Sequence, residues 1–138
     1  MSQEKSDTLR GGYQALSRTG EWPDDGLLAP DFELHQDSFV DTAKAFQGPG
    51  APGEIMRGLQ GAFREISFEV ERVIEAAAGT VVVLARVRGR GRASGTAIDK
   101  EQAHVWTFSG DRAIRMRIYA RPAEALKAVG LGKQAEET

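Results

Sequence analysis

Apolar and polar positions alternate most clearly near the end of the chain, over residues 103–121. Successive side chains of a strand point to opposite faces, so this alternation predicts two strands. The strands are separated by Gly110 and Asp111, and glycine readily adopts the positive φ of a two-residue hairpin turn. Such a turn, with constant register along the antiparallel ladder, places His104 opposite Arg117.

This pairing predicts two different faces for the hairpin. One face is polar and aromatic, and it consists of His104, Trp106, Phe108, Arg117, Tyr119 and Arg121. The other face is aliphatic, and it consists of Ala103, Val105, Thr107, Ile114, Met116 and Ile118. A polar-aromatic face can line a pocket, and it can equally be a solvent-exposed or subunit-contact face. The alternation alone leaves both interpretations open.

The rest of the chain shows helical spacing first and strand alternation later. The first helix is indicated by Leu9, Tyr13 and Leu16, with a cap at Ser6 or Asp7. Further elements are expected as a helical turn over residues 23–28, a strand over 31–36, a loose helix over 39–46, a helix over 55–63, strands over 66–77 and 80–92, and a helix from Pro122 to Gly130. Residues 1–5 and the tail from 132 are expected to be disordered. Helices followed by a run of antiparallel strands indicate the α+β class, with helices covering one face of the sheet.

Length and composition restrict the class of protein. A chain of 138 residues, 41% hydrophobic and 28% charged, is expected to form one domain, with its core over about 6–131. A net charge of −2 does not favour a nucleic-acid binder. Alternate arginines from Arg86 to Arg92 do not change this expectation, because no aromatic residues lie between them to stack on bases.

Several other classes of function are also disfavoured. The absence of cysteine excludes disulfides and thiol chemistry. No metal site is expected, because His35 and His104 have no third ligand at convincing spacing. We expect no cofactor. No signal peptide or membrane-spanning apolar run is evident, so the expected location is the cytoplasm and no membrane partner is expected.

Several segments together, in their order and spacing, resemble a known family. They are LRGGYQALSRTGEW, LLAPDFELH, the FQG before the middle helix, HVWTF and IYARPAEALKAVGL. Over about residues 6–131 the chain resembles the SnoaL-like branch of the nuclear transport factor 2-like superfamily, which includes ketosteroid isomerases and polyketide cyclases. The resemblance implies a strongly curved antiparallel sheet, helices that close a cone-shaped cavity, and dimers formed through the sheet. It favours the pocket interpretation of the polar-aromatic face.

The resemblance also implies roles for single residues. Tyr13 matches the position of the tyrosine that ketosteroid isomerases use as an oxyanion donor, and His104 matches the position of their second donor. Gln36 occupies the position of their general base. Asp37, one residue later, could replace that base if the alignment shifts.

The last strand departs from both patterns. Arg121 occupies the position of a large aromatic residue in the isomerases. In the polyketide cyclases an aspartate acid/base lies late in this strand, and the nearest residues here are Tyr119 and Arg121. Neither is a carboxylate, so the donors match and the usual base does not.

Three hypotheses follow for the function. The first is an isomerase or cyclase that transfers a proton beside a carbonyl, with His104, Tyr13 and Asp37 as catalytic residues. The second is a binding protein without chemistry, and the third is a dimeric interaction module. For the first two, the expected ligand is ring-shaped or carries a carbonyl. Its contacts are expected to come from Gln36, Trp106, Arg117, Tyr119 and Arg121. A homodimer through the aliphatic face is expected in all three cases.

Overall fold

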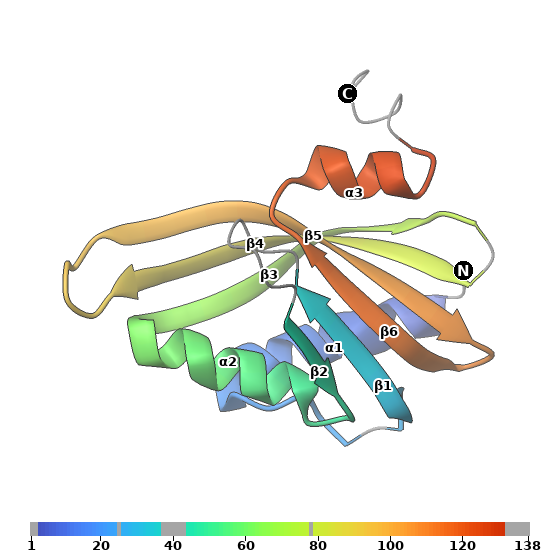
Figure 1. Ribbon diagram of the computed structural model, residues 1–138, viewed down its shortest axis with the longest axis horizontal. Helices are drawn as coiled ribbons and strands as arrows, with labels where there is room; N and C mark the ends of the chain where they lie inside the picture. The colour runs from blue at the N-terminus through green and yellow to red at the C-terminus, as the bar shows by residue number, and fades with distance from the viewer. Residues whose placement is uncertain (1–2, 25, 37–43, 78, 132–138) are drawn as a thin grey trace.

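The computed structural model describes residues 3–24, 26–36, 44–77 and 79–131 (Figure 1). Within them the chain forms three helices and six strands. In chain order they are α1 (Gln3–Thr19), β1 (Leu28–Gln36), β2 (Lys44–Gln47), α2 (Ala51–Ala62), β3 (Phe63–Glu75), β4 (Thr80–Gly91), β5 (Ala97–Ser109), β6 (Arg112–Tyr119) and α3 (Pro122–Ala128).

The six strands form one curved sheet in the order β2-β1-β6-β5-β4-β3. Four of the five neighbouring pairs are antiparallel, and β1 pairs with β6 in parallel. The α+β class and the curved sheet are confirmed, and this one parallel pair is the exception to the predicted antiparallel arrangement. In this pair, β1 lies beside β6, the last strand of the chain, and runs in the same direction. The two edge strands of the sheet are β2 and β3.

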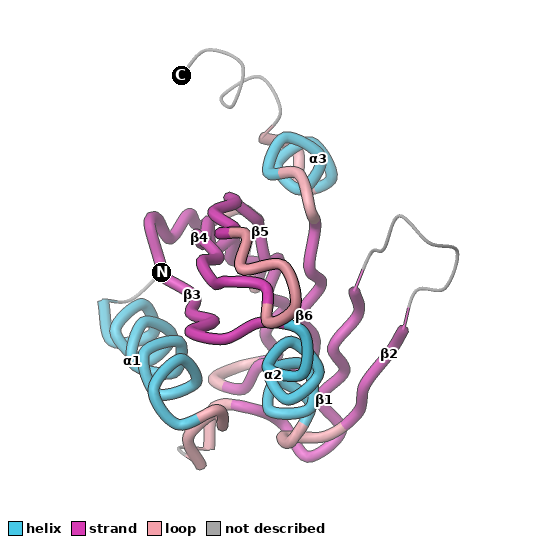
Figure 2. Tube along the Cα trace, turned by 90° about the vertical axis from the view of Figure 1, so that its left-hand side faces the viewer, coloured by secondary structure: helices cyan, strands magenta, loops and turns pink. Residues whose placement is uncertain are grey.

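The helices cover both faces of the sheet unequally (Figures 1 and 2). Helices α1 and α2 lie on the concave face, and the larger hydrophobic core fills the space beneath them. Helix α3 lies on the opposite face, where Ala125 and Leu126 pack on Val82 and Ala103 in a smaller cluster. Among the described residues, no helix is both long enough and apolar enough to cross a membrane.

Most predicted elements are confirmed, with differences at their boundaries. Helix α1 begins at Gln3, before the predicted cap, so residues 3–5 are helical rather than frayed. No helical turn forms over the described residues between 23 and 28. Residues 44–47 form strand β2 instead of the end of a loose helix, while 37–43 and the tail from 132 lie outside the described residues. Helix α2 begins at Ala51, because Pro52 suits the first turn of a helix.

Helix α1 contains two adjacent glycines, Gly11 and Gly12, and a close contact explains the second. The indole ring of Trp22 lies directly against Gly12, and a Cβ atom at that position would overlap the six-membered ring. At Gly11, by contrast, a Cβ would meet nothing within 4 Å. Only the second glycine is therefore required for packing, and it lets Trp22 reach the core beneath the helix.

The register of the β5–β6 hairpin differs from the prediction. Ser109 pairs with Arg112 as expected, but a register shift between Thr107 and Phe108 leaves Ile114 as an extra residue. Beyond this irregularity His104 lies opposite Ile118, not opposite Arg117. A shift of one residue moves every later side chain to the other face.

The two predicted faces of the hairpin are therefore wrong on β6. Met116 and Ile118 lie in the core with His104 and Trp106. Arg117, Tyr119 and Arg121 do not share that face: Arg117 and Arg121 are exposed, and Tyr119 packs at the edge of the α3 cluster. The predicted continuous aliphatic outer surface does not form, because two of its members are core residues and Ala103 is covered by α3.

Candidate ligand-binding site

The most unusual feature of the core is a buried polar residue. His104 lies in the middle of β5 with 1% of its surface exposed, and it is the one polar side chain among the fully buried residues that the structure describes. Strand alternation turns it toward α1, where Tyr13 faces it from the buried side of the helix. The two rings are nearly parallel, with centroids 5.6 Å apart.

Hydrogen bonds connect four side chains in a row. The Trp106 Nε1–H donates to the Tyr13 hydroxyl oxygen over 3.0 Å. The same oxygen lies 2.6 Å from His104 Nδ1. On the other side of the imidazole, His104 Nε2 lies 3.1 Å from Gln102 Oε1.

The chemistry of the donors fixes the direction of this relay. An indole N–H can only donate, so the Tyr13 oxygen accepts from it. The Tyr13 hydrogen has two acceptors within reach, His104 Nδ1 at 2.6 Å and Met116 Sδ at 3.7 Å. Because a thioether sulfur is the weaker and more distant acceptor, we assign this hydrogen to His104 Nδ1. A neutral imidazole whose Nδ1 accepts must carry its hydrogen on Nε2. That Nε2–H then donates to Gln102 Oε1. The hydrogen-bond chain therefore ends as a single donor directed at Gln102.

Burial keeps both ionisable members of the relay neutral. Desolvation of the imidazolium lowers the pKa of His104 to about 4. Desolvation of the phenolate raises the pKa of Tyr13 well above its usual value, and the hydrogen bond from Trp106 opposes this only in part. At neutral pH the relay carries no charge. His104 is therefore poised as a hydrogen-bond donor, not as a base.

Two neighbouring hollows lie on the concave side of the sheet, and Ile55, Phe68 and Ile118 line both of them. The inner one has a volume of about 20 Å³, and Tyr13, Trp22 and His104 contribute to its walls. Such a space can hold one water-sized group. The Trp22 Nε1 is buried and has no hydrogen-bond partner among the described residues, so this part of the core retains one unused donor.

The outer hollow lies between α2 and the sheet and has a volume of about 100 Å³. Its walls are mainly apolar, with a few polar groups, and the residues that line it are Gln36, Ile55, Leu59, Phe68, Val87, Ile98, Lys100, Gln102 and Ile118. Gln102 is half-buried and joins this cavity to the relay. Lys100 is the one charged side chain among the described residues in its walls.

The structure brings together only some of the predicted site residues. Tyr13, His104 and Trp106 are in direct contact, and Gln36 lines the outer cavity. Asp37 lies outside the described residues. The remaining three, Arg117, Tyr119 and Arg121, are separated from His104 by the register shift described above.

Sequence reasoning missed Gln102, Lys100 and Trp22. Gln102 and Lys100 precede His104 by two and four residues, so strand alternation could have placed both on its face. Trp22 lies in a segment without regular structure, and only tertiary packing brings it to the core. No sequence signal marks Trp22 itself, although its ring rests on Gly12.

The charged residues of the central strands face the other way. On the convex side Arg86 pairs with Glu71 and Asp99, and Arg88 pairs with Glu69. No carboxylate occurs among the described residues that line either cavity. Among those residues no cluster of histidine, aspartate and glutamate could hold a metal ion. Apart from Lys100, the described polar groups of the site are therefore neutral hydrogen-bond donors and acceptors.

Comparison with solved structures identifies the same architecture elsewhere. An NTF2-like protein of unknown function from Burkholderia pseudomallei superimposes with a TM-score of 0.69 at 22% identity, covering 94% of this chain and 99% of the other. TerC, co-crystallised with polyporic acid, gives a TM-score of 0.69 at 18% identity, covering 91% and 96%. A protein named as a SnoaL-like polyketide cyclase from Jannaschia sp. CCS1 gives 0.63 at 20% identity, covering 91% of each chain.

At these low identities, the three similarities show the fold alone and not the ligand or the activity. No curated protein is similar enough to the chain to count as a match. The family profile of the SnoaL-like domain, however, matches residues 19–116, which include β1 to β5 and most of β6. With its ketosteroid isomerase-like fold, the chain belongs to the SnoaL-like family.

Proposed function

We propose that the protein binds a small, mainly apolar organic molecule that carries a hydrogen-bond acceptor such as a carbonyl oxygen. The ligand occupies the outer cavity between α2 and the sheet. The observation that carries this proposal is the polar end of the cavity, where Gln102 covers the N–H of a neutral, buried histidine. An apolar pocket with a few directed polar groups is typical of small-molecule sites.

The geometry suggests how the ligand is recognised. Gln102 Oε1 already shows that an sp² oxygen can accept from His104 Nε2–H at 3.1 Å. A ligand carbonyl that displaces Gln102 takes over this bond, while Tyr13 keeps the imidazole in the donor tautomer. Tyr13 then acts as a positioning residue, because its own hydrogen is already used by His104.

The size of the cavity limits the ligand. An apolar cavity of about 150 Å³ can hold benzene. The outer cavity, at about 100 Å³, therefore limits the ligand to a single ring, part of which extends to the open side beside the exposed Lys100. A ligand with several rings requires movement of Phe68, which borders both the inner and the outer hollow. Polyporic acid bound to TerC supports an organic ligand for this fold.

The proposal concerns binding rather than a reaction. Proton transfer beside a carbonyl needs a base, and a histidine that donates from Nε2 and accepts at Nδ1 has no free nitrogen to serve as one. Of the predicted bases, Gln36 lines the cavity as a neutral amide and Asp37 lies outside the described residues. An isomerase or cyclase activity would rest on Asp37.

We also propose a homodimer through the convex face of the sheet. Its support is not the predicted aliphatic patch but the part of β5 and β6 beside α3, where Val105 and Tyr119 are half-buried. The paired charges around Arg86 border this region. A two-fold interface would place equal patches of this kind against each other.

Titration with cyclohexanone, followed by amide chemical shifts in NMR, tests the binding proposal. We expect saturable shifts at Ile98, Gln102 and Ile118, and weaker binding of cyclohexane, which lacks the acceptor. In the variant Ile98→Trp the larger side chain should fill the cavity and abolish the shifts. Thr107→Trp, half-buried on the opposite face of the same strand, is the matched control and should bind as the parent does. Equal shifts in both variants would overturn the proposal.

A further inference from the structure

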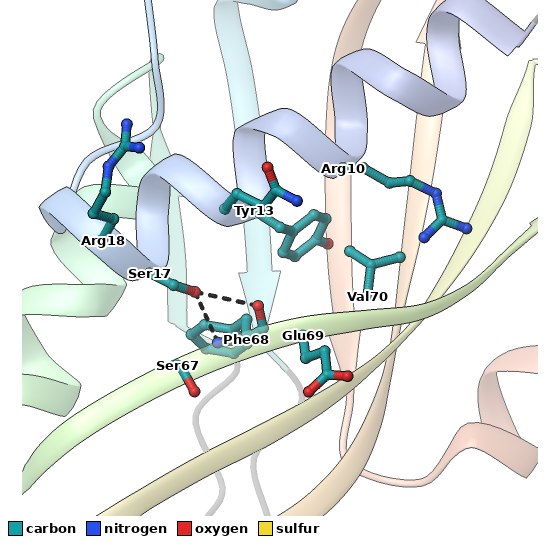
Figure 3. Close-up of a pocket in the computed structure, with 9 residues that line it drawn as sticks. Arg10, Tyr13, Ser17, Arg18, Ser67, Phe68, Glu69 and Val70 are labelled. Atoms are coloured by element: carbon teal, nitrogen blue, oxygen red, sulfur yellow. Dashed lines mark hydrogen bonds between the residues drawn. The ribbon is translucent and has the colours of Figure 1, made fainter.

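A third and larger hollow lies between α1 and the edge strand β3 (Figure 3). Its volume is about 420 Å³, within the range of ligand pockets. It is lined by Arg10, Tyr13, Gln14, Ser17, Arg18, Ser67, Phe68, Glu69 and Val70. We refer to it as the α1–β3 groove. The outer cavity lies under α2 instead, and Phe68 is the one described residue that lines both it and the groove.

The charges of the groove are unbalanced. Arg10 is half-buried and has no ion pair with any described residue, and Figure 3 shows it extending from α1 to lie beside Val70. The single carboxylate in the lining, Glu69, pairs with Arg88 of the neighbouring strand. In Figure 3 Glu69 points away from α1. A partly buried guanidinium beside apolar side chains favours an anionic ligand.

The backbone of β3 adds a second polar group. Ser17 Oγ accepts from the Phe68 N–H over 2.9 Å and donates to the Phe68 carbonyl oxygen over 3.2 Å, so both backbone groups face α1 rather than β4. Alternation along an antiparallel strand turns the N–H and C=O of Val70 to this same side. At one end of the groove, Ser17 thus binds the backbone groups of Phe68. At the end beside Arg10, the N–H and C=O of Val70 face the groove from the outer edge of the sheet.

From this arrangement we propose that the α1–β3 groove is a binding site for a small organic carboxylate with an apolar body. The carboxylate accepts from the Arg10 guanidinium and from the Val70 N–H. The apolar body lies on the side chains of Phe68 and Val70. This site is independent of the ligand proposed for the outer cavity.

The probe for this site is 2-naphthoate, and its neutral counterpart is 2-naphthamide. We expect the carboxylate to bind at least tenfold more tightly than the amide, with amide shifts at Gln14 and Val70 and none at Ile98 or Gln102. Binding should weaken as the salt concentration rises, because Arg10 is partly exposed to solvent. Saturating cyclohexanone should leave the affinity for naphthoate unchanged.

The variant Arg10→Gln should lower the affinity for naphthoate by about tenfold, while Arg112→Gln, an exposed arginine at the β5–β6 turn, should have no effect. Unfolding curves of both variants check that the fold is retained. Equal affinity of Arg10→Gln and the parent, or equal binding of carboxylate and amide, would overturn the proposal. Shifts at Gln102 in place of Val70 would also overturn it, because they would assign the naphthoate to the outer cavity.

Discussion

Among single residues, the indole of Trp106 sets the direction of the hydrogen-bond relay. Its N–H can only donate, so the Tyr13 oxygen accepts from it, and the short distance to His104 Nδ1 assigns the Tyr13 hydrogen to the imidazole rather than to Met116 Sδ. The two residues that the family resemblance selects as paired donors are therefore not equivalent. Tyr13 donates inside the protein, and His104 alone directs a hydrogen toward the cavity.

Removal of the Tyr13 hydroxyl tests this arrangement. The variant Tyr13→Phe leaves both the Trp106 N–H and His104 Nδ1 buried without a partner. Each such loss costs about 1–3 kcal/mol, so we expect the free energy of unfolding to fall by about 2–6 kcal/mol in urea denaturation. Tyr119→Phe is the control, since Tyr119 is half-buried and its hydroxyl has no hydrogen bond among those described; it should change stability by less than about 0.5 kcal/mol. Similar effects of the two substitutions would contradict the relay.

The low pKa of His104 predicts a pH dependence of stability. In the unfolded chain a histidine takes up a proton near pH 6.5, whereas folded His104 stays neutral until about pH 4. Between these values the unfolded state binds more protons, so stability is highest above pH 6.5 and falls as the pH decreases toward 4. The loss attributable to His104 approaches about 3 kcal/mol, because each pKa unit corresponds to about 1.4 kcal/mol.

Urea unfolding of the parent and of His104→Gln at pH 7.5 and pH 4.5 measures this contribution. The carboxylates titrate in both proteins, so the difference between the two pH dependences isolates the histidine. We expect the parent to lose more stability than the variant over this interval. Parallel losses would show that His104 is protonated in the folded state near its ordinary pKa.

At the scale of elements, the hairpin shows what sequence patterns can and cannot predict. Alternation correctly located β5 and β6, the turn between them and the buried face that carries His104 and Trp106. It could not reveal the extra residue at Ile114, because an irregularity of one residue leaves each strand's own alternation nearly intact. The misplaced side chains of β6 all follow from this single shift.

The contact between α1 and Trp22 provides a matched pair of glycine variants. Gly12→Ala forces a Cβ into the indole ring, and overpacking of a core commonly costs about 1–3 kcal/mol. Gly11→Ala meets no atom within 4 Å and should stabilise the helix by about 0.5–1 kcal/mol. Thermal unfolding of the two variants should therefore shift in opposite directions. A stabilised Gly12→Ala would mean that Trp22 does not rest on this helix.

At the scale of the whole molecule, the curved sheet and the helices on its concave face create the cavity that no single element predicts. Gln36 ends β1, whereas Lys100 and Gln102 lie in the first half of β5, and only the sheet order brings β1 and β5 to either side of β6. The family resemblance predicted a cavity of this general kind. It could not identify Gln102, which is specific to the packing around His104.

The proposed homodimer is a further prediction at this scale. Light scattering should give a mass of about twice the 15.0 kDa of one chain. Val105→Arg would place a charge beside α3 in the proposed interface and should shift the protein toward the monomer. Lys5→Glu, on α1 at the opposite face, serves as the control and should leave the mass unchanged. A parent protein that is monomeric at micromolar concentration would contradict the dimer without affecting the cavity.

A long-range ¹H–¹⁵N correlation spectrum of the His104 ring, recorded at pH 7 with and without saturating cyclohexanone, observes the proposed donor itself. We expect a neutral imidazole with its hydrogen on Nε2 in both spectra. We also expect cyclohexanone to change the Nε2 resonance more than that of Nδ1, because the ligand replaces Gln102 at Nε2 only. A hydrogen on Nδ1, a protonated ring, or an Nε2 resonance that does not respond to the ketone would contradict the proposal.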